Sequence, residues 1–161
     1  MIDNSEERGD PEIVPAKVTI VIPCRAEYVA VARLAILGVA NRLSYSYDEV
    51  EDVRLAVGEA CTHAVERARS IGHGVVRDPK IYIESQIGPG GLDIEVRDNI
   101  PSNGATPPTE VEDDLGFDKR DLGALLLEIL VDRFSVRATQ EGTTVRLVKH
   151  APNSQTAIGP A

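Results

Sequence analysis

The spacing of hydrophobic residues changes along this chain, and its first part predicts one strand followed by two helices. Residues 17–23 are rich in β-branched side chains and end in proline, which is typical of a short strand. Apolar residues then recur at helical spacing over residues 26–43, where we expect a buried stripe of Val29, Ala32, Leu34, Ala35, Ile36, Val39 and Leu43. A second helix is predicted from Ser46 to about Arg69, because Ser46 and Glu49 have the spacing of a capping box.

Two segments farther along alternate between apolar and polar residues with period two, which predicts a β-hairpin. They span residues 80–87 and 92–97 and are separated by Gly88-Pro89-Gly90-Gly91, a sequence suited to a tight turn. Such alternation buries one face of a hairpin and leaves the other in water. Residues 98–121 follow with little apolar periodicity, and a loop of this length in a compact domain is usually functional or disordered.

The remaining pattern predicts a third helix and a closing hairpin. The helix runs from Leu122 to about Val131. We expect its buried side to consist of Leu125, Leu126, Ile129 and Leu130. Residues 133–138 and 143–149 form the hairpin, with a turn at Glu141-Gly142. The order β-α-α-β-β-loop-α-β-β indicates an α+β two-layer sandwich, with helices on one face of a mostly antiparallel sheet.

Length and composition indicate a single domain. The chain has 161 residues, of which 42% are hydrophobic, and this suffices for one substantial core. We place the domain at residues 17–150, with a lid-like loop at 98–121. Residues 1–16 and 151–161 are expected to be flexible, because they are rich in charged or small polar residues, proline and glycine.

The net charge of −9 restricts the kinds of partner. Nucleic acids and anionic membranes are held by Lys and Arg, so this acidity argues against direct binding to either and suits a basic protein partner. The first residues are acidic without an apolar core, and the apolar segment at about residues 29–40 is too short to span a bilayer. Together with two cysteines outside any CxxC motif, Cys24 and Cys61, these features favour a cytoplasmic location.

Glu59 and His63 are the most informative side chains, four residues apart in the second predicted helix. Residues at this spacing lie on the same helical face, so the carboxylate and the imidazole face one space. A charge among alanines favours Glu59 as a pocket acid over an exposed rim residue. For His63 the first interpretation is an ion pair with Glu59; a positive charge in place of a metal, or a space-filling role, are the alternatives. Cys61 points away from both, which leaves too few ligands for a metal site.

Four stretches together give this sequence a specific family resemblance. They are Glu27-Tyr28-Val29 and residues 45–52, 59–62 and 142–147. From about Lys17 to His150 the chain resembles the RsbW/SpoIIAB anti-sigma factor serine kinases, members of the GHKL ATPase superfamily with the Bergerat (histidine-kinase-like ATPase) fold. The resemblance implies a stress-response regulator that sequesters a sigma factor and phosphorylates a serine on an antagonist (anti-anti-sigma) protein. It also implies a homodimer formed through the first strand and first helix, and a sigma-contacting role for Arg33.

The resemblance further implies roles for single residues of a site for ATP or ADP with Mg²⁺. Glu59 matches the catalytic carboxylate that polarises the attacking hydroxyl or water. Asp98, at a strand end, matches the acid that accepts a hydrogen bond from the adenine amino group. Gly123 matches a glycine at the start of a helix whose N–H groups meet phosphates. Gly142 and Thr144 match the closing motif near the adenine.

Three departures from the family pattern fall in this nucleotide site. His63 stands where the family has the Asn that binds Mg²⁺, and magnesium prefers oxygen ligands to imidazole. Ile100 replaces the glycine of Asp-x-Gly, which adds bulk and restricts the backbone. Arg120 and Asp121 replace a glycine pair; Arg120 is a candidate phosphate ligand, whereas Asp121 would repel phosphate. Together the departures predict nucleotide binding that is weak, altered or lost.

These features lead to one leading hypothesis and two alternatives. The first is an RsbW-like anti-sigma factor that holds a sigma factor, answers to an antagonist protein, and has a kinase activity that the departures put in question. The second is an active ATP-dependent protein serine/threonine kinase with Glu59 as its base. The third is a nucleotide-free adaptor with an unrelated protein partner.

Overall fold

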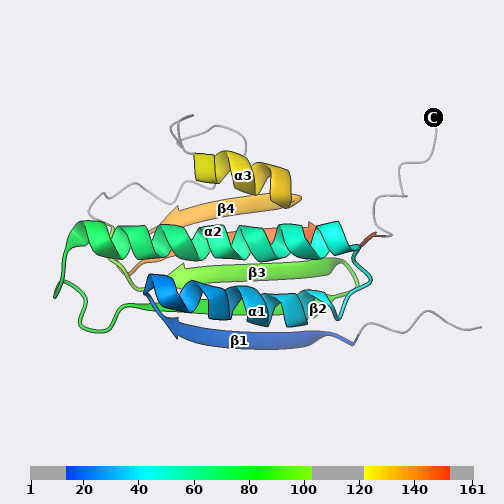
Figure 1. Ribbon diagram of the computed structural model, residues 1–161, viewed down its shortest axis with the longest axis horizontal. Coiled ribbons are helices and arrows are strands. Elements are labelled where there is room, and N and C mark those ends of the chain that lie inside the picture. The colour runs from blue at the N-terminus through cyan, green and yellow to red at the C-terminus, as the bar shows by residue number, and fades with distance from the viewer. Residues whose placement is uncertain (1–13, 103–121, 153–161) are drawn as a thin grey trace, which may run out of the picture.

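The computed structural model describes residues 14–102 and 122–152, and this part of the chain forms two layers. One antiparallel sheet has the strand order β1-β2-β3-β5-β4, and the helices cover one of its faces (Figure 1). In chain order the elements are β1 (Ala16–Pro23), the 3₁₀ turn η1 (Ala26–Tyr28), α1 (Val29–Ala40), α2 (Tyr47–Ile71), β2 (Lys80–Gly88), β3 (Gly91–Asp98), α3 (Leu122–Leu130), β4 (Arg133–Ala138) and β5 (Thr143–His150). The predicted α+β sandwich is therefore confirmed.

The long helix α2 lies in the middle of the helical layer, between α1 and α3 (Figure 1). Its predicted capping box is present: the Ser46 N–H donates to Glu49 Oε2 at 2.7 Å, and the Glu49 N–H donates to Ser46 Oγ at 3.2 Å. The helix continues past the expected end to Ile71. Because α2 has a neighbour on each side, a residue on its flank can meet either α1 or α3.

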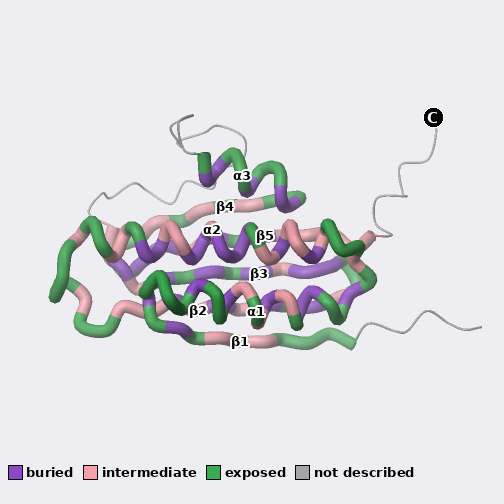
Figure 2. The backbone as a smooth tube through the Cα atoms, viewed as in Figure 1, coloured by how far each residue is buried: buried purple, intermediate pink, exposed green. Residues whose placement is uncertain are grey.

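The hydrophobic core lies between the helices and the inner face of the sheet. β3 occupies the centre of the strand order and is largely buried (Figure 2). The alternation predicted for the first hairpin is confirmed by the buried residues of β2 and β3, which include Ile81, Ile83, Ile94 and Val96. From the helical side the core receives small residues of α2, such as Ala56, Ala60 and Ala64. Small residues here let α2 approach the sheet closely.

The first helical segment differs from its prediction. Residues 26–28 form a 3₁₀ turn, and regular α-helix covers only Val29–Ala40. Leu34, expected in the buried stripe, is 68% exposed, whereas Ala32 and Ile36 are fully buried. A segment with apolar residues on most of its surface does not define its inward face by periodicity alone, and packing against α2 decides which side is buried.

The inward face predicted for α3 is mostly wrong. Leu125, Leu126 and Ile129 are exposed. The buried residues are Gly123, Ala124, Leu127 and Leu130, so only the last of the four expected positions is inward. The sequence of α3 is apolar on all sides except at Glu128, which leaves the pattern without a polar face to read.

Several predictions fall on segments outside the described residues. These are residues 1–13 and 153–161 of the ends expected to be flexible, and residues 103–121 of the lid-like loop, which include Arg120 and Asp121. Ala16, expected in the first flexible segment, is the first residue of β1. Within the described ranges, no helix combines the length and the apolar character needed to cross a membrane.

Candidate functional site

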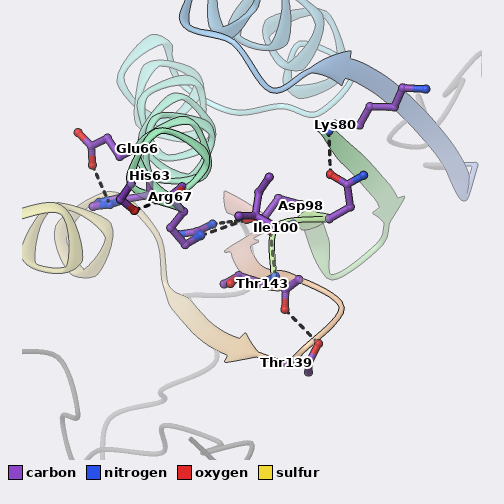
Figure 3. Close-up of polar contacts among 11 residues, drawn as sticks. His63, Glu66, Arg67, Lys80, Asp98, Ile100, Thr139 and Thr143 are labelled. Atoms are coloured by element: carbon purple, nitrogen blue, oxygen red, sulfur yellow. Dashed lines mark hydrogen bonds and ion pairs between the residues drawn. The ribbon is translucent and has the colours of Figure 1, made fainter. Parts of the chain in front are cut away.

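Asp98, the last residue of β3, is the centre of the candidate site. Its side chain has no exposed surface. Oδ1 accepts from two main-chain groups, the N–H of Ile100 at 2.9 Å and the N–H of Thr143 at 3.1 Å. Figure 3 shows these contacts at the point where β3 ends and β5 begins. The predicted placement of a carboxylate at a strand end is thus observed, with its orientation fixed by the backbone.

The second oxygen of Asp98 is held by Arg67, a residue that the sequence analysis did not single out. Arg67 lies on α2, and both its Nε, at 3.2 Å, and its Nη2 donate to Asp98 Oδ2 (Figure 3). The signal was available, because Arg67 follows His63 by four residues and Glu59 by eight and therefore shares their helical face. A buried carboxylate needs such a partner, since an unpaired buried charge is strongly unfavourable.

Glu59 and His63 form the ion pair that their spacing predicts. His63 Nε2 lies 3.1 Å from Glu59 Oε1, and the two side chains are 28% and 27% exposed. On its other side the ring faces Glu66, with Nδ1 3.5 Å from Oε2 (Figure 3). The imidazole therefore bridges two carboxylates of α2, and one of them is the candidate catalytic residue.

Gly123, in the first turn of α3, lies directly against this pair. A Cβ on Gly123 would be 2.1 Å from His63 Nε2 and 2.7 Å from Glu59 Oε1. The structure thus brings together three of the residues predicted for the phosphate and metal side of the site. It also shows why glycine stands at this position, since any side chain would displace the imidazole or the carboxylate.

Gly142 and Thr144 are placed differently from each other. A Cβ on Gly142, where φ is +154°, would lie 1.9 Å from the carbonyl oxygen of Asp98, so this glycine permits the close approach of β5 to β3. Thr144 instead pairs with Arg97 and lines the outer face of the sheet with Glu95. Thr143, one residue earlier, is buried and donates to Asp98. The resemblance placed Thr144 near the adenine, but it is Thr143 that contacts the candidate adenine-binding carboxylate, because successive strand residues face opposite sides.

The segment after Asp98 has a structural role. Asn99 Oδ1 accepts from the Lys80 N–H at 2.8 Å, and its Nδ2 donates to the carbonyl of Asp78 at 3.0 Å, which ties this segment to the start of β2. Ile100 is 1% exposed and belongs to the hydrophobic core. The bulk predicted from the missing glycine is therefore present, and it is used for packing.

The two cysteines are free and buried. Burial raises the pKa of the Cys24 thiol from 9.0 to about 11; nearby Asp98 raises it further, and Arg67 lowers it. Burial likewise raises the pKa of Cys61 to about 12. Both groups are therefore protonated at neutral pH and lack the thiolate that nucleophilic or metal-binding chemistry needs.

Arg33 lies away from the Asp98 group, at the contact between α1 and α2. A Cβ on Gly58 would be 2.2 Å from Arg33 Nε, so the guanidinium packs over this glycine. Arg33 Nε is buried and has no hydrogen-bond partner among the described residues. The predicted partner contact is thus a half-buried cation beside exposed Val31 and Leu34 of the same helix.

A nucleotide with Mg²⁺ does not fit these side chains as they stand. An ionised carboxylate offers about four acceptor positions, and Asp98 already receives four donors from the protein. At the other end, His63 and Gly123 crowd Glu59. Among the described residues no group of three or more His, Cys, Asp or Glu could hold a metal ion.

An antiparallel sheet with one helical layer and a carboxylate at the end of a central strand is the arrangement of a known class of protein domain. Residues 22–149 match the family model described as the histidine kinase-like ATPase domain, and the chain belongs to this family. Curated relatives are more specific, and they identify homology to RsbW serine kinases. The chain is 33% identical over 136 residues to the serine-protein kinase RsbW of Bacillus licheniformis, covering 79% of this chain and 81% of the relative.

Two further comparisons complete this picture. The serine-protein kinase RsbW of Bacillus subtilis strain 168 is 34% identical over 137 residues, which cover 80% of this chain and 82% of that protein. Among solved structures, the histidine kinase domain from the Erythrobacter litoralis EL346 blue-light activated histidine kinase matches with a TM-score of 0.49 and 19% identity, over 87% of this chain and 69% of that one.

Proposed function

We propose that this protein is an anti-sigma factor of the RsbW type whose primary activity is to bind a sigma factor, under the control of an antagonist protein. The observation that carries the proposal is a contrast within one domain. The family scaffold extends over residues 22–149, whereas Glu59 and Asp98 are occupied by other side chains of the same chain. Protein binding needs the scaffold and its surface, while phosphoryl transfer needs those two carboxylates free.

Charge supports a sigma factor as the partner. The chain carries a net charge of −9, and the DNA-binding faces of sigma factors are basic because they meet phosphates. Complementary charge speeds association and selects among partners. A basic face covered by this protein would be withdrawn from promoter DNA.

The test is a set of titrations with the sigma factors of the native host. We expect one of them to bind with one-to-one or two-to-one stoichiometry in calorimetry, and transcription from its promoters by the purified holoenzyme to stop. Transcription that depends on the other sigma factors is the matched control. If none of the sigma factors of the host binds, the proposal is wrong.

An active serine kinase remains the second candidate, and one observation favours it. Glu59 is partly exposed and lies beside Gly123 in the first turn of α3, where helix N–H groups can meet phosphate. Radiolabelled ATP, Mg²⁺ and the antagonist protein from the same host provide the assay. Transfer that disappears in Glu59→Gln would support the kinase, and its absence in the unchanged protein would exclude it.

Exposed apolar residues support the expected homodimer. β1 is an edge strand, and α1 lies beside it (Figure 1). Val21 on β1 is 50% exposed, and Val31 and Leu34 on α1 are 47% and 68% exposed. An edge strand flanked by apolar side chains is a natural pairing surface. Light scattering after gel filtration would test this, with Leu34→Asp expected to shift the mass to that of a monomer.

A further inference from the structure

Asp98 is saturated by donors that belong to the protein itself. Oδ1 receives the two main-chain N–H groups, and Oδ2 receives both donors from Arg67. These four bonds match the number of lone-pair positions on a carboxylate. A ligand amino group that approached this residue would find no acceptor position left.

The donors differ in how easily they can leave. The N–H groups of Ile100 and Thr143 are fixed, because one sits in the turn after β3 and the other at the paired start of β5. Arg67 is a flexible side chain and is 32% exposed, whereas Asp98 has no exposed side-chain surface. Rotation of Arg67 toward solvent would open both positions on Oδ2 without moving the backbone. Arg67 is therefore the movable donor of the set.

We propose that Arg67 controls access to the base-recognition carboxylate of the nucleotide site: its guanidinium occupies the place of the base amino group on Asp98, so an adenine nucleotide binds only when Arg67 withdraws. This inference takes Asp98 as the residue that recognises the base, as the family resemblance implies, and it is independent of sigma binding. The ligand class follows from the chemistry, because a carboxylate selects a base with an exocyclic amino group.

Arg67 lies on the same face of α2 as the pair at the other end of the site. Glu59, His63 and Arg67 are spaced by four residues and form one face of the helix. Along that face, His63 is paired with the candidate catalytic carboxylate and Arg67 with the candidate base-recognition carboxylate. Two basic side chains of one helix thus lie against the candidate carboxylates at the two ends of the same site.

Calorimetric titration with ADP tests the proposal in the full-length protein. Arg67→Met keeps an unbranched apolar stem and removes both donors, so we expect the affinity for ADP to rise by about tenfold or more. Arg67→Lys keeps the charge with a single donor nitrogen, and we expect a smaller gain of about threefold. The control is Arg54→Met, which removes an ion pair with Glu51 on the same helix and leaves Asp98 unchanged. Its affinity should stay within about twofold of the unchanged protein.

Inosine diphosphate separates base recognition from a general effect of charge. It carries a carbonyl where ADP carries the amino group, so removing Arg67 should improve binding of ADP and leave binding of inosine diphosphate unimproved. Equal gains for both ligands would overturn the proposal, as would an unchanged or weaker affinity for ADP in the folded variants. If Arg67→Met does not fold because Asp98 is left unpaired, Arg67→Lys alone decides by the same criterion.

The same variants keep this inference separable from the proposed function. Sigma binding is measured without nucleotide. If the unchanged protein binds no sigma factor, the anti-sigma proposal is contradicted, while the ADP titrations of the Arg67 variants still test the role of Arg67. Conversely, if the ADP affinity is the same in the Arg67 variants and the unchanged protein while sigma binding is normal, only the proposed role of Arg67 is overturned.

Discussion

Gly123 lies so close to His63 that a Cβ at this position would come within 2.1 Å of Nε2. The next nearest atom is Glu59 Oε1, at 2.7 Å. Both atoms are at the ends of flexible side chains, which can rotate away. In Gly123→Ala we therefore expect the imidazole to move and the contact with Glu59 to break, with the helix left in place. A partly exposed pair contributes little and alanine favours helix, so the free energy of unfolding should change by less than about 1 kcal/mol.

Urea denaturation gives the stability of Gly123→Ala, and the imidazole signals in NMR report the movement of His63. A loss of several kcal/mol would contradict this prediction, because it would show that α3 is locked onto the pair.

Gly142→Ala should be far more costly, although the geometric conflict looks similar. Here the Cβ would lie 1.9 Å from the carbonyl oxygen and 2.9 Å from the carbonyl carbon of Asp98, and main-chain atoms held in a sheet cannot rotate away. The φ of +154° adds backbone strain for any side chain. We expect the free energy of unfolding to fall by more than about 2 kcal/mol in urea denaturation. Gly38→Ala, in α1 with nothing near its Cβ, is the control and should be neutral or slightly stabilising.

The strands and α2 could be predicted from sequence because local chemistry determines them. Ser46 with Glu49 forms the observed cap, and the period-two pattern from Lys80 to Arg97 forms the observed hairpin. The inward face of α3 could not be predicted, because its apolar residues surround the helix and the contact of Gly123 with His63 is a tertiary constraint.

The candidate site was predictable in its members more than in its contacts. The spacing of Glu59 and His63 gave their ion pair, and the strand end gave the position of Asp98. The partner of Asp98 was missed, because the bond to Arg67 joins residues 31 apart in sequence and depends on how α2 packs over β3. Thr144 was misplaced because a shift of one residue in a strand reverses the side that faces the site.

Ser85→Ala should not destabilise the protein. Ser85 is fully buried on β2, and its Oγ has no hydrogen-bond partner among the described residues. A buried hydroxyl without a partner is unfavourable, so its removal should raise the free energy of unfolding by about 0.5–1 kcal/mol. The control is Thr62→Val on α2, because the Thr62 hydroxyl donates to the Gly58 carbonyl at 2.9 Å. Its removal should lower the free energy of unfolding. A loss above about 1 kcal/mol in Ser85→Ala would contradict the prediction.

Arg33→Glu should weaken sigma binding. A cation at the sigma contact of an otherwise acidic protein implies an acidic group of the partner opposite it, so reversing this charge beside exposed Leu34 should lower the affinity in calorimetry by about tenfold or more. Because Arg33 also packs over Gly58, Arg33→Gln is needed as a control that keeps a polar stem without the reversed charge. The thermal midpoint of both variants should remain close to that of the unchanged protein. An unchanged sigma affinity in Arg33→Glu would exclude this part of α1 from the interface.

The buried thiols predict how stability depends on pH above 9. The pKa of Cys24 is raised by burial from 9.0 to about 11, and that of Cys61 to about 12, so the folded state keeps protons that the unfolded chain releases. The stability that the two buried thiols contribute is complete below pH 9; it is lost as pH rises through about 11 for Cys24 and about 12 for Cys61. Each thiol can lower the free energy of unfolding by at most about 1.4 kcal/mol per pH unit in this window.

Urea denaturation between pH 8 and about 10.5 under reducing conditions measures this slope against that of the double variant Cys24→Ala, Cys61→Ala. Burial also raises the pKa of Tyr45, which both proteins share, so the difference between their slopes belongs to the thiols. The double variant should lose stability less steeply, whatever its stability at pH 8. Parallel profiles would mean that the two thiols titrate alike in the folded and unfolded chains, which their burial on the sheet-facing side of α2 and at the end of β1 argues against.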